Sequence, residues 1–169
     1  MERSENLANL SFKKLIVYGQ DLPFFSTSEK IDEINSHCSE IKLSVREFLN
    51  LPENKTQKFD AIEFNNIKID EFFAANYAWK LKDSIDLSFI GCSCINGIKW
   101  KDLFASTDVT NLKMNMCGLT NDEAIYIACN LYPWTLKSVT FENENIDKEL
   151  VINAIIENSV ISKNMIIFN

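Results

Sequence analysis

One spacing of apolar residues returns along the chain and limits its fold more than any other feature. In the segment Asn111–Tyr132, counted from Leu112, positions 0, +2 and +7 are apolar, and they hold Leu112, Met114 and Leu119. Copies of this spacing, the last of them incomplete, start at Leu15, Ile41, Ile62, Ile85, Leu112, Val139 and Met165. Successive starts are 21 to 27 residues apart. A period in this range over a whole chain predicts a solenoid of stacked repeats.

Each copy is expected to hold a strand followed by a helix. Residues at positions 0 and +2 point to the same side of a strand, because successive side chains alternate. Beyond position +7 of the fifth copy, Thr120 and Glu123 form a Thr-x-x-Glu capping box, and apolar residues follow at helical spacing from Ala124 to Leu131. Asp147 is expected to begin the helix of the next copy in the same way. These helices would pack their apolar sides against the strands.

The fifth copy resembles the leucine-rich repeat family, whose framework is L-x-x-L-x-L-x-x-N/C-x-L. The framework positions are filled by Val109, Leu112, Met114, Cys117 and Leu119. Its tail resembles the helix-bearing repeats of the ribonuclease-inhibitor-like subgroup. The resemblance implies a short α/β solenoid of about seven β-α repeats, with a parallel sheet on the concave face and helices on the convex face.

The other copies depart from the family at the Asn/Cys place, where the family's residue ties adjacent turns together by hydrogen bonds. That place is filled by Gln20, Arg46, Ile67, Ile90 and Glu144. We expect less regular turns in those copies, while Cys117 is expected to stabilise its own turn.

The repeats predict one domain over residues 1–169. Residues 1–11 would form a polar N-terminal cap, and repeat strands would start near residues 12, 38, 59, 82, 109, 136 and 162. The final segment, Met165–Asn169, is an apolar strand with no capping unit after it. Either this edge is frayed or covered, or it forms a homodimer or another partner contact. A register slip of one residue there would exchange Met165 and Ile167 for Ile166 and Phe168.

Charge and composition narrow the range of partners and locations. The chain has 17 Lys+Arg and 24 Asp+Glu, for a net charge of -7. This charge argues against nucleic acid or an anionic membrane as a partner and favours a basic protein. The start of the chain lacks the apolar run of a secretory signal, and no later run is long enough to span a membrane, which predicts a cytoplasmic protein. In that compartment the five cysteines would be reduced.

Motifs for catalysis, metals or cofactors are weak. The single histidine, His37, adjoins Cys38, and adjacent side chains of a strand point in opposite directions, so they cannot form a catalytic pair. Cys92 and Cys94 have no second Cys or His pair at metal-site spacing, and none of the four glycines belongs to a phosphate-binding loop. We therefore expect a protein that is not an enzyme and that binds neither a metal nor a cofactor.

One pair of carboxylates keeps an enzymatic alternative open. Glu63 and Asp86 both occupy position +1 in neighbouring copies, so they are predicted to lie side by side, about one strand spacing apart. Paired acids can perform general acid and base catalysis, as in a hydrolase.

The outward positions of the predicted strands carry the candidate binding site. Their centre is polar and acidic, and it is flanked by apolar and aromatic residues, a pattern typical of protein interfaces. The predicted partner-binding residues are Tyr18, Glu63, Asn65, Asp86, Phe89, Lys113, Asn115, Met116, Glu142 and Phe168. Together with the family resemblance, they predict an inhibitor or immunity-type protein that occludes a basic partner. An adaptor or a secreted effector using the same face is the alternative.

Overall fold

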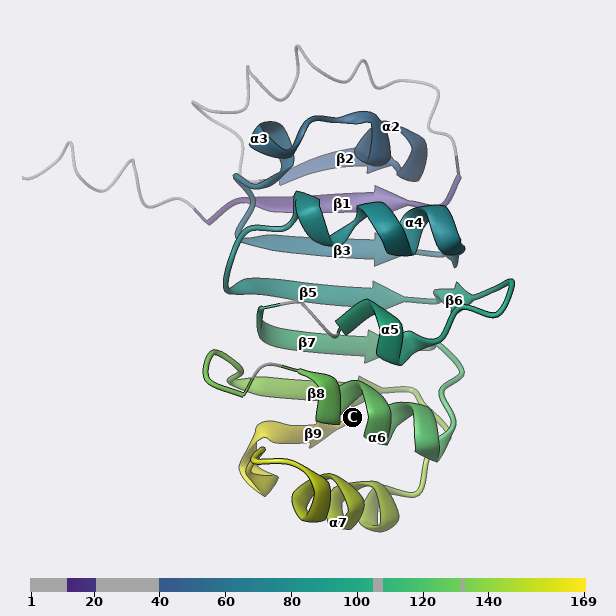
Figure 1. Cartoon of the computed structure of the whole chain (residues 1–169), viewed down its shortest axis with the longest axis vertical. Helices are drawn as coiled ribbons and strands as arrows, with labels where there is room; N and C mark the ends of the chain where they lie inside the picture. The colour runs from purple at the N-terminus through teal and green to yellow at the C-terminus, as the bar shows by residue number, and fades with distance from the viewer. Residues whose placement is uncertain (1–11, 21–39, 105–107, 132) are drawn as a thin grey trace, which may run out of the picture.

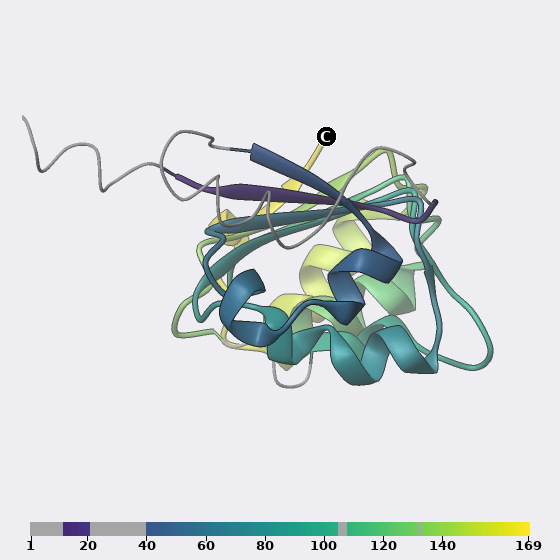
Figure 2. The same cartoon turned by 90° about the horizontal axis from the view of Figure 1, so that it is seen from above.

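The computed structural model describes residues 12–20, 40–104, 108–131 and 133–169. In these residues the chain has an α/β fold in which helices cover one face of a parallel sheet (Figures 1 and 2). The predicted N-terminal cap, residues 1–11, and the pair His37 and Cys38 lie outside the described residues.

The described part of the sheet has seven parallel strands in the order β2-β1-β3-β5-β7-β8-β9. They are β1 (Lys14–Tyr18), β2 (Glu40–Ser44), β3 (Ala61–Asn65), β5 (Ile85–Ile90), β7 (Val109–Asn115), β8 (Ser138–Glu142) and β9 (Ile166–Phe168). Two short strands, β4 (Lys68–Ile69) and β6 (Ser93–Cys94), pair with each other beside the main sheet.

The repeats predicted strands stacked in chain order. This prediction is confirmed from β3 to β9 but is wrong for the first two strands. β1 lies between β2 and β3, so β2 forms one edge of the sheet (Figure 1). Leu15 is level with both Ile41 and Ile62 in the two pairings. All three strands have the same alternation of inward apolar residues. This alternation shows which face of a strand is buried, but it does not show which strand lies beside it. The repeat spacing therefore could not distinguish the two orders.

The helices in the described residues follow the strands and lie on one side of the sheet. They are α2 (Val45–Asn50), α3 (Glu53–Thr56), α4 (Glu71–Asn76), α5 (Trp100–Phe104), α6 (Asn121–Asn130) and α7 (Lys148–Asn158), with 3-10 turns η2 (Ala78–Lys80) and η3 (Lys163–Met165). The predicted capping box of Thr120 and Glu123 is confirmed at the start of α6, and Asp147 caps α7 as predicted. None of these helices has the length and apolar character needed to cross a bilayer.

The core lies between the sheet and the helices and contains a run of aromatic rings. The Phe64 and Phe89 rings stack with their centroids 5.1 Å apart, and Phe89 meets the edge of Trp100 at 5.2 Å. Phe89 has no exposed surface. Its prediction as a partner-binding residue is wrong, because β5 extends to Ile90 and the alternation of side chains turns Phe89 toward the helices.

The alignment of β5 also differs from the predicted one. Ile62 is level with Leu87 and not with Ile85. Because the difference is two residues, the inward set is unchanged, but every outward side chain of β5 moves by one place along the sheet.

At β9 the structure adopts the alternative register. Val139 is level with Ile166, and Phe141 with Phe168. Phe168 packs beside Phe141 on the helix side, with ring centroids 5.7 Å apart. Its prediction as an outward partner-binding residue is therefore wrong, because the turn η3 takes up Met165 and the strand begins one residue later.

Candidate functional site

One face of the sheet is left uncovered by the helices of the described residues (Figure 2). It holds the sequence-predicted site, and we call it the open face. It consists of the outward side chains of the seven strands, which form three rows across the sheet. In sheet order from β2, the rows are Glu40, Lys14, Ala61, Asp86, Asn111 and Ser138; Lys42, Ile16, Glu63, Ser88, Lys113, Thr140 and Ile167; and Ser44, Tyr18, Asn65, Ile90, Asn115 and Glu142. Apart from Phe89 and Phe168, the predicted binding residues lie in these rows or, for Met116, directly after β7.

Glu63 is held in place by its neighbours on β1 and β3. Its carboxylate accepts hydrogen bonds from Lys14 Nζ at 2.7 Å and from Asn65 Nδ2 at 2.8 Å. Partial burial alone would raise the pKa of Glu63, but the hydrogen bonds from Asn65 and Lys14 and the charge of Lys113 outweigh it and hold the pKa below its ordinary value. This carboxylate is charged and already paired.

The predicted side-by-side placement of Glu63 and Asp86 is wrong. Glu63 is level with Ser88, and Asp86 is level with Ala61, because β5 is aligned through Leu87. Asp86 instead accepts a hydrogen bond from Asn111 Nδ2 at 2.8 Å. The two carboxylates therefore do not face each other across neighbouring strands.

A second group, spanning β7 and β8, joins four of the predicted residues to Asn143. We call Lys113, Asn115, Met116, Glu142 and Asn143 the β7–β8 cluster. Glu142 forms an ion pair with Lys113 and accepts a hydrogen bond from Asn115 Nδ2 at 3.1 Å. Asn143 Nδ2 donates to Asn115 Oδ1 at 3.1 Å. These bonds fix a polar platform at the end of the two strands.

Met116 is the apolar member of that cluster and has an unusual backbone. Its φ of 52° is left-handed, and 57% of its surface is exposed. The equivalent residues after the neighbouring strands are Gly91 and Asn143, which also have positive φ and are residue types that tolerate it. A methionine in this conformation costs roughly 1–2 kcal/mol, and its exposed side chain recovers little of that by packing. Met116 is therefore a candidate for a role outside the core.

The chain makes the same hydrogen-bonded turn after four neighbouring strands. The backbone N–H of the left-handed residue donates to the carbonyl of a residue at the end of the next strand. The four bonds are Asn66 to Ile90 (2.9 Å), Gly91 to Asn115 (2.9 Å), Met116 to Glu142 (3.2 Å) and Asn143 to Asn169 (3.1 Å). This ladder places the β7–β8 cluster at a regular, well-supported edge.

Side chains one residue further along strengthen the ladder. The Cys92 thiol donates to the Phe64 carbonyl at 3.3 Å, and the Cys117 thiol donates to the Phe89 carbonyl at 3.4 Å. Burial raises the pKa of the Cys117 thiol to about 12. Both cysteines thus act in the turns as neutral hydrogen-bond donors.

Glu144 occupies the same place after β8, where a loose turn was expected. Its carboxylate accepts from the backbone N–H of Cys117 at 2.6 Å and of Leu119 at 2.9 Å. The expectation of a less regular turn is wrong here, because a carboxylate with two oxygens can bridge two backbone donors. With β5 aligned through Leu87, it is Cys92 and not Ile90 that stands at the equivalent place.

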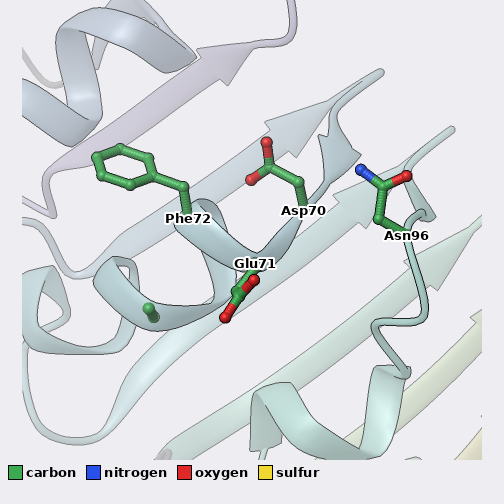
Figure 3. A pocket seen from close by; sticks show the side chains of 5 residues that line it. Asp70, Glu71, Phe72 and Asn96 are labelled. Atoms are coloured by element: carbon green, nitrogen blue, oxygen red, sulfur yellow. The ribbon is translucent and has the colours of Figure 1, made fainter.

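A second surface, on the helix side, was not predicted. A shallow pocket at the start of α4 is lined by Asp70, Glu71, Phe72, Ala75 and Asn96 (Figure 3). A neighbouring hollow between α4 and α5 shares Ala75 and is bounded by Trp79, and Phe72 and Trp79 are 60% and 69% exposed. The small side chains Ala74, Ala75 and Ala78 line this hollow, and their closeness in the sequence is the feature that could have indicated it. Asp70 is engaged as the α4 cap, where its side chain accepts a hydrogen bond from Phe73 N at 2.9 Å.

Among the described residues, no group of three or more His, Cys, Asp or Glu side chains is arranged to hold a metal ion. Comparisons of the chain with protein-family models, curated proteins and solved structures found no match.

Proposed function

We propose that the chain is a non-catalytic protein-binding module whose open face recognises a partner, with the contact centred on the β7–β8 cluster. The observation that carries the proposal is Met116. An exposed apolar side chain is held in a costly left-handed conformation where neighbouring turns use glycine or asparagine. Local strain of this kind persists where a function requires the side chain. Around it, fixed amide and charged groups can orient a ligand.

The proposal includes a leucine-rich-repeat architecture. Its support is the turn that recurs after neighbouring strands, together with the cysteine thiols of Cys92 and Cys117 at the place where the family has Asn or Cys. The position of β2 outside β1 departs from a simple stack.

A basic protein is the proposed partner, in keeping with the net charge of -7. On the open face, however, Glu63 and Glu142 are already paired with lysines. A basic partner would have to compete with those lysines, so charge should speed association more than it adds affinity. An inhibitor or immunity-type protein acting in the cytoplasm fits this description, and an adaptor or effector would use the same face.

The hydrolase alternative has less support. Glu63 and Asp86 are out of line with each other, and both carboxylates are engaged in hydrogen bonds to neighbouring side chains. Replacing both residues by alanine would abolish the activity of such a hydrolase, whereas a binding module would have no turnover to lose.

The proposal is tested by capturing partners with three immobilised full-length proteins. These are the wild type, an open-face variant combining K113A, N115A and M116N, and a helix-side control combining F72A and W79A. The wild type and the control should retain the same partner, and the open-face variant should lose at least about tenfold in affinity, the size expected when interface anchors are removed. Raising the salt concentration should slow association and leave dissociation nearly unchanged.

The opposite pattern would overturn the proposal. A partner that binds the open-face variant as tightly as the wild type, and that is lost from the helix-side control, would place recognition on the surface of α4 and α5.

A further inference from the structure

The two edges of the sheet differ in chemistry. At one edge, β2 carries the exposed charged residues Glu40 and Lys42, and charges on an edge strand discourage another strand from pairing there. At the other edge, the stretch Met165–Asn169, which contains β9, has no charged side chain and no proline. Among the described residues, only β8 pairs with β9. Within the part of the chain that the structure describes, the β9 strand therefore carries neither the charges nor the proline that usually discourage strand pairing.

The backbone of β9 offers this edge a matched donor and acceptor. Asn169 directs both its groups toward β8: its N–H donates to the Phe141 carbonyl at 3.0 Å and its carbonyl accepts from Asn143 N at 3.1 Å. Because backbone groups alternate along a strand, those of Phe168 and the carbonyl of Ile166 point the other way. The N–H of Ile166 is used in the preceding turn, where it donates to the Lys163 carbonyl.

These groups are complementary to a second copy of the same edge. If two β9 strands run antiparallel about a two-fold axis at Ile167, each Phe168 N–H meets the Ile166 carbonyl of the other copy. The two bonds are then identical, as an isologous interface requires. Residues directly opposite each other at a non-hydrogen-bonded position lie about 4.5 Å apart between Cα atoms, so Ile167 would contact its own copy.

Apolar surface gathers at the same end of the molecule. Ile167 is 39% exposed on the open face. Leu150 and Ile156 of α7 and the following Val160 are also exposed, and Figure 1 shows α7 beside β9 at this end. Pairing of β9 would remove Ile167 from water and continue the sheet into a second molecule.

We propose that the chain forms a two-fold symmetric dimer by antiparallel pairing of β9 with β9 of a second copy. Head-to-tail pairing of β9 with β2 would instead build an open-ended assembly and bring the charged strand β2 against the uncharged one. The dimer does not depend on the proposed partner-binding role, and the β7–β8 cluster is not part of the pairing.

Oligomeric mass tests the proposal directly. Light scattering of the full chain over a range of concentrations should approach twice the monomer mass of 19.4 kDa. The variant I167K places a charge at the two-fold axis and should be monomeric. T140K is the matched control, since Thr140 lies level with Ile167 on the same face but one strand further in, and it should remain dimeric. Thermal unfolding shows whether each variant is folded.

Amide hydrogen exchange gives an independent measurement that needs no substitution. The Phe168 amide should become protected as the concentration rises, whereas the Asn169 amide, which bonds to β8, should be protected throughout. A wild type that stays monomeric, larger assemblies, a dimer that survives I167K, or a Phe168 amide whose exchange does not depend on concentration would each overturn the proposal.

Discussion

Three side chains of two chemical types support the turns at the carboxyl edge of the sheet. The thiols of Cys92 and Cys117 donate to carbonyls of the preceding strands, and the carboxylate of Glu144 accepts from two backbone N–H groups. At these three positions a polar side-chain atom bonds to a neighbouring strand or turn, whereas Ile67, at the same place after β3, has an apolar side chain and the turn there still forms. Residue type alone is therefore a poor guide to how regular such a turn is.

Glu144 should contribute more to stability than an ordinary surface glutamate. In E144A the N–H groups of the buried residues Cys117 and Leu119 lose their acceptor, and we expect a loss of about 2 kcal/mol in the free energy of unfolding. Urea unfolding measures the change. E157A, at the exposed end of α7, serves as the control and should change stability by less than about 0.5 kcal/mol. Equal losses in the two variants would contradict this account of the turn.

Replacing Met116, in contrast, should make the protein more stable. In M116N the left-handed backbone is retained by a residue that tolerates it, so the free energy of unfolding should rise by about 0.5–1 kcal/mol. The same variant should bind a partner less well if Met116 is kept for recognition. A variant that is less stable than the wild type would show that the exposed methionine supports the fold, and would remove the main argument for its binding role.

At the scale of elements, much of the pattern could be predicted from the sequence. The alternation of apolar residues indicates which face of a strand is buried, and the capping box at Thr120 and Glu123 marks the start of α6, as the structure confirms. The alignment of β5 with its neighbouring strands was harder to predict. Its inward residues Ile85, Leu87 and Phe89 alternate without interruption, so they fit two alignments equally well. The choice between them depends on the neighbouring strands, which local spacing does not encode.

Truncation of Phe89 tests its observed place in the core. Phe89 is a fully buried ring between Phe64 and Trp100. Replacing it by alanine should lower the free energy of unfolding by about 3–5 kcal/mol. S88A, the neighbouring change on the open face, is the control and should cost far less. Chemical denaturation of both variants gives the comparison. Similar small losses would mean that Phe89 lies outside the core.

At the scale of the whole molecule, the sequence predicted a sheet with one uncovered face but not how that face would distribute its charges. Negative residues exceed positive ones overall, yet on the open face Glu63 and Glu142 are joined to Lys14 and Lys113. These pairs join residues of different strands, so they depend on register and cannot be read from net charge. The face is consequently a mixed polar surface and not an acidic patch.

The contacts of two carboxylates, Glu63 and Asp60, make the stability of the molecule dependent on acid pH. Despite burial, the pKa of Glu63 is held below its ordinary value by Asn65 and Lys14, and that of Asp60 by Lys82 and the Lys13 backbone. A depressed pKa in the folded state means that protonation favours unfolding. The stabilisation is complete above the ordinary carboxyl range, roughly pH 5 and higher, and is lost as the pH falls through the folded-state values.

The double variant E63Q and D60N tests this dependence. It should be less stable than the wild type at neutral pH, because neutral amides make weaker contacts with Lys14 and Lys82. It should also lose less stability on acidification, since two of the groups that bind protons on unfolding are gone. Denaturant unfolding across the acid range measures both effects. In K14M, carboxyl NMR titration should show the pKa of Glu63 moving upward. Parallel pH profiles for the double variant and the wild type would contradict this assignment.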